Sequence, residues 1–452
     1  MSTSPSLLSH ALAILKNYPD AENLYVAYSG GMDSHVLLNL LVNNQEYINS
    51  KIIAVHVNHG LSKESSLWAK HCSDLCEKLE VKYIEIDVDA AAPKGESQEE
   101  WSRKLRYDAL KKLLNTGDIL YTAHHKDDLA ETLLLQLFRG AGPAGLSAIP
   151  EYIKFGKGWH IRPFLNITRN ELSEIANKFN HSWIIDDSNS DERFDRNYLR
   201  HKIMPVINAR WPGILKTLSR SARIQTEVTE LIEELAKIDL DCCMNLTNNT
   251  LNQSCIKNLS DSRSLNLIRY WLKTLEQRSP SSAILRQILI DIVHSGPDAS
   301  PCIKWDDVEI RRYRDMIFLT QNLPSMSQLD NEIRWDPDNE CKLKYGKIIT
   351  RSAVGMGISI HKIDGKELSI RYRDGHEEIK LGGHHHTLKN IFQEKGIPPC
   401  FRDLIPLIYM GTTLVEIAGL CINEDFQAKP DELTLQVVWN RAEEVYAMKY
   451  IN

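Results

Sequence analysis

The sequence predicts an α/β protein: an N-terminal domain built on a parallel sheet, then a mainly helical domain, then a small α+β C-terminal domain. In the first ~140 residues, short apolar runs alternate with longer amphipathic stretches, a pattern typical of a parallel sheet with helices on both faces. From residue 168 to about 320 the pattern is mostly helical. After about residue 325, short alternating runs return, which indicates strands.

The predicted elements of the N-terminal domain alternate regularly between strand and helix. Strands are expected over 24–28, 52–57, 83–88 and 119–123, and helices over 34–42, 65–79, 97–114 and 127–139. Residues 143–157 are expected to form a loop. Because parallel sheets of this kind bind ligands at the carboxyl ends of their strands, the segments that follow the strands are the first candidates for a functional site.

The later elements are predicted from periodicity and from turn residues. Helices are expected over 264–275, 282–292 and 387–395, a hairpin over 308–319 around Arg314-Asp315, and two short strands turning near Gly411 within 404–422. That last stretch is too interrupted by polar residues to span a membrane. We place the domains at 1–215, 216–325 and 326–452.

Composition and cysteine usage narrow the class of protein. The chain has 452 residues, of which 42% are hydrophobic and 25% are charged, as in ordinary globular proteins. Its N-terminus has no basic segment ahead of its apolar residues and so does not resemble a secretory signal; a cytoplasmic location is expected. The nine cysteines show neither framework spacing nor C-x-x-C, which argues against a disulfide scaffold and a zinc site. The net charge of −6 argues only weakly against nucleic acid, because binding depends on local patches.

A glycine-rich loop follows the first predicted strand and opens the first predicted helix. Its residues are Ser29, Gly30, Gly31, Met32, Asp33 and Ser34. Glycines let the backbone approach an anion closely, and the N–H groups at a helix N-terminus favour negative charge. The loop lacks the lysine of a Walker A motif, and Asp33 beside a polyphosphate requires a bridging cation, so we expect ATP and Mg²⁺ here. The alternative is a turn that merely joins strand to helix.

A second G-x-G-x-x-G pattern, at 140–145, does not meet the requirements of a dinucleotide site. It follows a predicted helix instead of a strand and contains Pro143, so we interpret it as loop.

Two further segments carry candidate functional side chains. Asp128 and Glu131 fall three residues apart at the start of the helix that follows the fourth strand, and therefore share one face of it. Such carboxylates can hold Mg²⁺, receive an ammonium group or act as a base, although acidic residues are also common in any first helical turn. Residues 195–210 are basic, which suits phosphates or RNA; the alternative is a solvated helix face.

The phosphate loop resembles that of the PP-loop ATP pyrophosphatase superfamily, whose members carry S-G-G-x-D-S. Further segments make the chain similar to the tRNA(Ile)-lysidine synthetase family: 56–61, 103–107, 124–132, 139–146, 183–189, 195–200 and 382–394. The resemblance covers both ends of the chain and is densest over 24–211.

This resemblance implies a reaction and a set of site residues. ATP would adenylate the wobble cytidine of tRNA(Ile) with a CAU anticodon, and L-lysine would then replace AMP at C2. Asp33 and Asp128 would organise Mg²⁺ and the reacting groups, Glu131 would receive the lysine ammonium, and Arg196 would stabilise phosphate charge. Candidates for contact with lysine or tRNA are His59, Arg103, Arg106, His124, Asn197 and Arg200. The second domain would bind substrate and the third would recognise tRNA. No membrane is implied, and a homodimer is compatible with the resemblance.

Three alternatives remain open at this point. A PP-loop tRNA thiolase needs cysteines near the site, and 1–215 holds only Cys72 and Cys76, which fit core packing better. An amidotransferase-type synthetase would need a glutaminase cysteine near the N-terminus. A non-catalytic tRNA-binding protein would not need the intact loop at 29–34.

Overall fold

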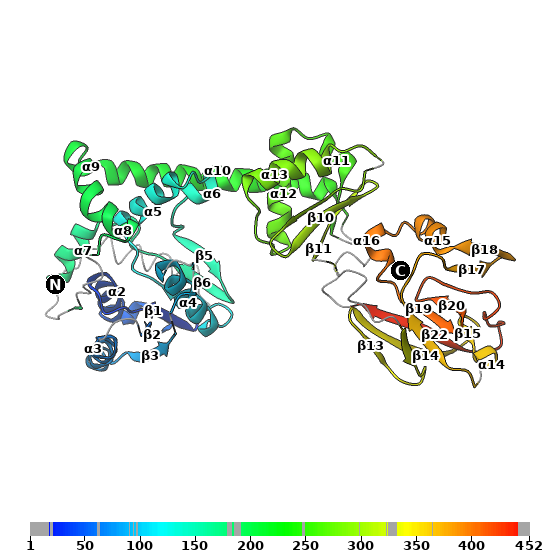
Figure 1. Ribbon diagram of the computed structural model, residues 1–452. Coiled ribbons are helices and arrows are strands. Elements are labelled where there is room, and N and C mark those ends of the chain that lie inside the picture. Colours follow the sequence, from blue (N-terminus) through cyan, green and yellow to red (C-terminus); the bar gives the residue numbers. More distant parts are fainter. Residues whose placement is uncertain are drawn as a thin grey trace. The chain divides into compact units, whose positions relative to one another are not determined.

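The computed structural model consists of two compact units, Met1–Leu231 and Ile232–Asn452 (Figure 1). The structure describes residues 18, 21–60, 64–89, 91–93, 95, 98–178, 183–184, 191–245, 249–297, 299–321, 323, 332–363 and 365–441. Residue 61 and residues 185–189, which belong to two segments of the family resemblance, lie outside the described residues.

The first unit is built on a six-stranded sheet with the order β3-β2-β1-β4-β6-β5. Its strands are β1 (Asn23–Ala27), β2 (Lys51–Asn58), β3 (Lys82–Asp87), β4 (Ile119–Tyr121), β5 (Tyr152–Phe155) and β6 (Gly158–Ile161). All neighbouring strands are parallel except β5, which pairs antiparallel with β6. The predicted parallel sheet is therefore confirmed, with an antiparallel edge strand added.

Helices cover both faces of this sheet, as predicted. They are α2 (Met32–Val42), α3 (Ser65–Lys78), α4 (Gln98–Leu113), α5 (Lys126–Phe138), α6 (Pro143–Leu146) and α7 (Arg169–Ala176). Successive strand residues point to opposite faces. Leu24 and Val26 of β1 accordingly pack in the core formed with α2, α3 and α7, whereas Tyr25 packs in the core formed with α4. A strand buried on both faces requires the continuous apolar run that the sequence shows.

The prediction of a loop over 143–157 is wrong. The segment contains α6 and β5, which is followed by a tight turn into β6. Most of β5 is exposed, including Tyr152 and Ile153, because the strand lies at the edge of the sheet. An exposed edge strand lacks the buried apolar alternation on which the prediction depended.

A run of helices closes the first unit. It comprises α8 (Asp195–Tyr198), the π-helical turn η3 (Leu199–Ile203), α9 (Met204–Arg210) and the long α10 (Ile214–Cys243). At the start of α10, Ile214 and Leu218 pack against the apolar side of α5 and α9, and Ala222 is buried beside Leu129 and Leu133 of α5. The helix runs through residue 215 without interruption, and the domain boundaries at 215 and 325 stay predictions.

The first part of the second unit combines helices with a five-stranded sheet. Its elements are β7 (Met244–Asn245), β8 (Thr250–Asn252), α11 (Gln253–Lys257), α12 (Asp261–Thr274), α13 (Ser282–Gln287), the π-helical η4 (Ile288–Val293), β9 (Cys302–Trp305), β10 (Val308–Tyr313) and β11 (Met316–Gln321). The expected hairpin around Arg314-Asp315 is confirmed by the pairing of β10 with β11. A disulfide, which the sequence did not predict, joins Cys243 to Cys255, because the antiparallel pairing of β7 with β8 brings α10 and α11 together.

The remainder of the second unit is an α+β fold, as predicted. Its elements are β12 (Glu332–Trp335), β13 (Cys341–Leu343), β14 (Gly346–Val354), β15 (Ile358–Ser359), α14 (Ile360–Ile363), β16 (Leu368–Arg371), β17 (Glu378–Leu381), β18 (His384–Thr387), α15 (Leu388–Glu394), α16 (Pro399–Arg402), β19 (Leu407–Met410), β20 (Thr413–Ile417), β21 (Cys421–Ile422) and β22 (Leu433–Arg441). The β19–β20 hairpin turns at Gly411, as expected.

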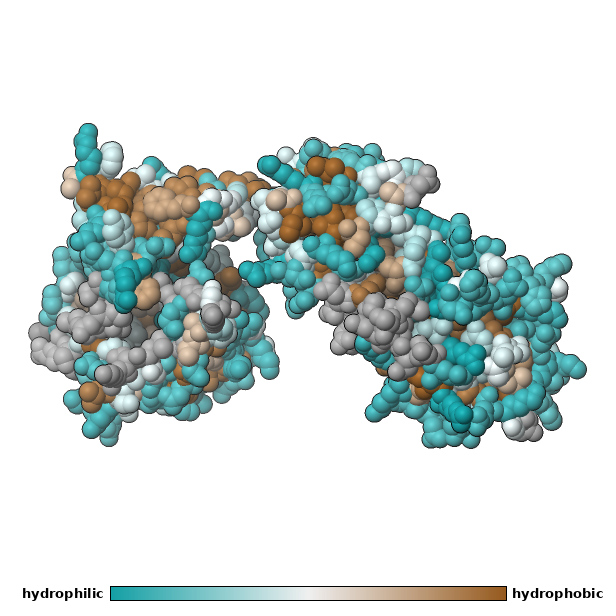
Figure 2. Space-filling model, in the orientation of Figure 1, coloured by the Kyte–Doolittle hydropathy of each residue, from teal (hydrophilic) through white to brown (hydrophobic). Residues whose placement is uncertain are grey.

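The surface is largely hydrophilic, but apolar side chains gather over α9 and the adjoining part of α10 (Figure 2). Val206, Trp211 and Ile224 are exposed there. Within the described residues, no helix is both long enough and apolar enough to cross a membrane.

Candidate active site

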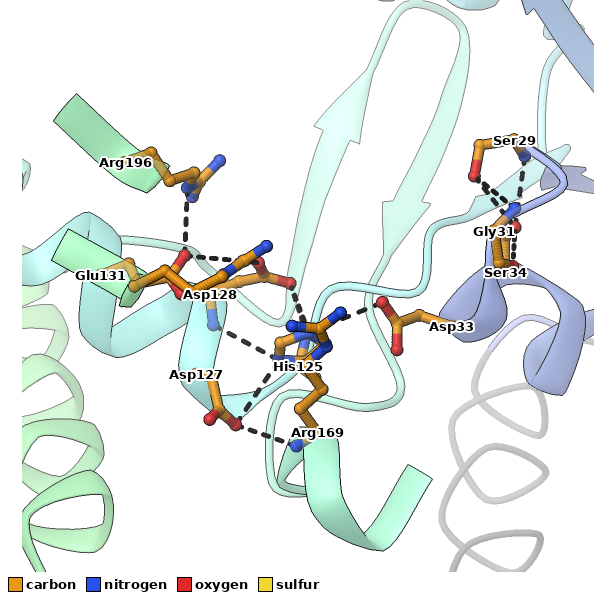
Figure 3. Close-up of polar contacts among 11 residues, drawn as sticks. Ser29, Gly31, Asp33, Ser34, His125, Asp127, Asp128, Glu131, Arg169 and Arg196 are labelled. Carbon is orange, nitrogen blue, oxygen red and sulfur yellow. Dashed lines mark hydrogen bonds and ion pairs between the residues drawn. The ribbon is translucent and has the colours of Figure 1, made fainter. Parts of the chain in front are cut away.

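The phosphate loop lies between the end of β1 and the start of α2, as the sequence predicts. Its two serines hold it in shape: the Ser29 and Ser34 hydroxyls are 3.1 Å apart, Gly31 N–H donates to Ser29 Oγ, and Ser34 Oγ donates to the Gly31 carbonyl (Figure 3). These bonds pin the turn at the N-terminus of α2, where backbone N–H groups favour an anion.

Gly30 allows this turn to form. Its φ of +81° lies in the left-handed region, and a Cβ there would come within 2.5 Å of Ile184 Cδ1 and 2.9 Å of Cys72 Sγ. Ile184 N–H also donates to the Gly30 carbonyl. Cys72 and Cys76 are fully buried, which confirms their interpretation as core packing.

His125 joins the phosphate loop to the first turn of α5, which follows β4 and carries Asp127 and Asp128 (Figure 3). We call this segment the acidic turn. His125 caps α5 in a reciprocal capping box with Asp128, an arrangement that satisfies N–H groups at the helix start. Its imidazole lies 3.7 Å from Asp33, 3.6 Å from Asp127 and 3.4 Å from Asp128. Burial by itself would lower the pKa of His125, but the bond to Asp127 and the charges of Asp128 and Asp33 raise it.

The carboxylate of Asp33 has one oxygen toward His125 and one without a partner. Asp33 Oδ1 is buried and makes no hydrogen bond to any described residue. Burial raises the pKa of Asp33 and the nearby Asp128 adds to this, while His125 opposes the shift. A buried, unpaired carboxylate oxygen is unfavourable unless a cation meets it. Asp33 therefore fits a divalent cation, although no group of three or more ligating side chains is found among the described residues.

Glu131 forms the centre of an ion-pair network beneath the acidic turn. Arg200 binds its two oxygens at 2.7 and 2.8 Å and also donates to Asp128 Oδ1 at 3.0 Å. Arg196 lies 3.3 Å from Glu131 and donates to Thr132 Oγ1 at 2.7 Å. Burial raises the pKa of Glu131, whereas the charges of His125, His124 and Arg196 bring the pKa of Asp128 below its usual range despite burial.

Several predicted contact residues form a cationic cluster. The guanidinium groups of Arg103 and Arg106 lie 5.0 and 5.4 Å from the centre of the Tyr107 ring. Burial together with Arg106 lowers the pKa of His59 to about 4. Burial also lowers the pKa of His124 well below its usual value, and its Nδ1 lies 2.8 Å from Thr122 Oγ1. Unlike the network around Glu131, this cluster is rich in cations that lack carboxylate partners in these contacts, which suits an anionic ligand.

The structure thus gathers Asp33, Asp128, Glu131, Arg196 and Arg200 at one edge of the sheet. Asn197 is the exception, because its amide donates to the backbone of Asp191.

Sequence reasoning did not assign roles to His125 or Arg169. His125 had a usable signal, since it precedes two aspartates at a helix start, where capping residues stand. Arg169 had none: it begins α7, donates its N–H to Asp127, and helps hold down the pKa of Asp33 by its charge.

The comparison with known proteins agrees with this architecture. Residues 5–207 match the PP-loop domain family, residues 251–318 match the TilS substrate binding domain, and residues 368–439 match the TilS substrate C-terminal domain. A tRNA(Ile)-lysidine synthase from Coxiella burnetii is 36% identical over 91% of both chains. The chain belongs to the tRNA(Ile)-lysidine synthase family.

Two further members of the tRNA(Ile)-lysidine synthase family show that the likeness extends over nearly the whole chain. The synthase of Legionella pneumophila strain Paris is 36% identical over 94% of this chain and 96% of its own. That of Methylococcus capsulatus is 34% identical over 92% and 95%, respectively. The family resemblance deduced from the motifs is therefore confirmed, and the N-terminal unit carries an ATP-binding PP-loop domain.

Proposed function

We propose that this protein is a ligase that attaches L-lysine to C2 of the wobble cytidine in tRNA(Ile) with a CAU anticodon. The C2 oxygen attacks the α-phosphate of ATP, forming an O–P bond and releasing pyrophosphate. The ε-amine of lysine then attacks C2, the C–O bond breaks, AMP leaves, and the amine loses a proton. A tRNA substrate agrees with the expected cytoplasmic location.

One observation carries this proposal beyond family membership. The phosphate loop and the acidic turn after β4, far apart in sequence, meet at His125, which contacts both Asp33 and Asp128. A group that binds ATP phosphates and a group that can orient a second substrate therefore occupy the same edge of the sheet. This is the arrangement that a nucleotidyl transfer followed by amine attack requires.

The proposed roles follow from the contacts. Ser29–Ser34 would hold the ATP phosphates through backbone N–H groups and hydroxyls. Asp33, with its unpaired oxygen, and Asp128 would hold Mg²⁺, which when bound neutralises charge on the phosphates. Arg196 would stabilise phosphate charge, and Glu131 would receive the lysine ammonium. The guanidinium groups of Arg103 and Arg106 would meet anionic parts of the substrates. His59 and His124, whose lowered pKa values keep them neutral near neutral pH, would contact the substrates through hydrogen bonds.

The cysteines argue against the thiolase alternative. Burial raises the pKa of Cys72 to about 12, and that of Cys76 likewise to about 12, so neither thiol is ionised near neutral pH. A thiol held in that form is a poor nucleophile and a poor cluster ligand. The intact phosphate loop supports catalysis over a non-catalytic tRNA-binding role.

The test is AMP release from labelled ATP by the full chain with Mg²⁺, lysine and tRNA(Ile) carrying a CAU anticodon. We expect release to depend on both lysine and that tRNA, with labelled lysine entering the RNA. Asp33→Asn should lower the rate by about 100-fold or more, whereas Asp74→Asn on exposed α3 should leave it unchanged. Release that needs tRNA but not lysine would redirect attention to another second substrate, and no release would favour a binding protein.

We also propose a homodimer, on the basis of the family resemblance alone. Light scattering on the purified chain measures the oligomeric state directly.

A further inference from the structure

Glu131, the carboxylate proposed to receive the lysine ammonium, and its neighbour Asp128 are already neutralised. Glu131 is only 2% exposed and is held by two guanidinium groups, those of Arg200 and Arg196. Asp128 is held by Arg200 and by His125. These two carboxylates therefore face two guanidinium groups, whose positive charge equals their negative charge, and an imidazole that Asp128 shares with Asp33 and Asp127.

A neutralised pair of carboxylates cannot select a cation. The lysine ammonium gains from Glu131 only if a charge of the same sign leaves, because a buried carboxylate that already has a bidentate partner offers little further attraction. Of the two arginines, only Arg200 bridges both carboxylates, and its three hydrogen bonds of 2.7 to 3.0 Å occupy the oxygens that an ammonium would need.

We propose that Arg200 is an internal stand-in for the lysine ammonium: in the unliganded protein its guanidinium occupies the amine-receiving Glu131 together with the adjacent Asp128, and it must leave Glu131 before lysine binds. This inference rests on the proposed function. Arg200 thereby sets when, and how tightly, the amine is accepted. In the meantime it keeps the buried carboxylate of Glu131 and the part-buried carboxylate of Asp128 from repelling each other.

The element that carries Arg200 suits such a movement. Arg200 lies in the π-helical turn η3, between α8 and α9. Single π-turns within α-helices are uncommon, are found at functional sites and hold one residue more than an α-turn. A change of this turn to α-helical hydrogen bonding shifts the register of the residues within it and thereby moves the Arg200 side chain relative to α5. Two registers of one short segment thus provide two positions for the guanidinium.

The experiment measures L-lysine binding to the full chain by calorimetry, without ATP or tRNA. Arg200→Gln removes the stand-in, and we expect it to bind lysine about tenfold more tightly than the wild type, or better. Arg200→Lys keeps the charge but loses the two-pronged geometry, so its affinity should fall between the two. Arg223→Gln removes an exposed arginine, paired with Glu227 on α10, and should bind lysine as the wild type does.

A purely structural ion pair gives a different result. If Arg200 only fastens α8 and η3 to α5, the glutamine variant loses stability and lysine affinity stays equal or falls. The inference would be overturned if Arg200→Lys or Arg200→Gln bound lysine no more tightly than the wild type, or did not bind it detectably. If the glutamine variant does not fold, Arg200→Lys still tests the inference. Lysidine formation by the wild type reports separately on the proposed function.

Discussion

The imidazole of His125 lies 3.7 Å from the carboxylate of Asp33, and this contact connects the phosphate loop after β1 to the acidic turn after β4. Both residues stand at the carboxyl ends of adjacent parallel strands. Neighbouring strand ends in a parallel sheet bring such loops together regardless of their distance along the chain. The site is therefore a consequence of strand order as much as of its motifs.

Gly30→Ala should disable the phosphate loop. The substitution places a Cβ at a left-handed φ and against Ile184 and Cys72, so we expect a loss of about 2 kcal/mol or more in stability and loss of ATP binding. Thermal unfolding and nucleotide-binding titrations measure the two effects. Gly140→Ala is the matched control, because Gly140 has a φ of +69° but open space around it. Equal effects of the two substitutions would show that close packing at Gly30 is unimportant.

Glu131→Gln should destabilise the first unit. It leaves Arg196 without its buried carboxylate partner and Arg200 with Asp128 alone, which costs about 3 kcal/mol. Urea unfolding of the full chain, followed by tryptophan fluorescence, measures the change. Glu174→Gln on the exposed side of α7 should shift stability by less than about 0.5 kcal/mol. A variant at Glu131 as stable as the control would mean that the network contributes little to folding.

A fragment that ends at residue 231 should fold and bind ATP but lose selectivity for its tRNA. Recognition of a folded RNA requires surfaces beyond the nucleotide site. A fragment that ends at residue 215 should be less stable, because it lacks Leu218 and Ala222, which pack against α5. Calorimetry and tRNA competition binding measure these properties. Equal tRNA selectivity of the 1–231 fragment and the full chain would contradict the expectation.

Glu416 should make the second unit less stable as pH rises. It is 4% exposed on β20, its Oε2 has no partner among the described residues, and burial raises its pKa to about 8. The native state keeps a proton that the unfolded chain loses above about pH 4.5, so stability falls between pH 4.5 and 8 and then levels off.

Glu416→Gln should remove that pH dependence. The free energy of unfolding of this variant, relative to that of the wild type, should increase by about 4 kcal/mol between pH 4.5 and 8, because each unit of pKa shift corresponds to ~1.4 kcal/mol. Scanning calorimetry across this range follows the transition of the second unit, with exposed Glu378→Gln as the control. A difference that does not change with pH would show that Glu416 is ionised in the folded protein.

Much of the fold was predictable because its signals are local. The apolar runs of β1, β2 and β4 and the helices that follow them are continuous along the chain, and the turns at Gly411 and Arg314-Asp315 carry their own turn residues. The edge strand β5 was missed because its exposed residues lack a buried periodicity. In the mostly helical region before residue 325, only the β10–β11 hairpin gave a clear alternating signal, so the other strands of that sheet were not predicted.

The sequence by itself determined the phosphate loop, the acidic turn and the family, since each is a short pattern of residues whose chemistry is readable without coordinates. Only the tertiary structure decided which charges meet. Glu131 and Asp128 share a helix face by sequence, but their partner Arg200 arrives from η3. Long-range ion pairs depend on how distant segments pack, and a pattern within one segment carries no record of that.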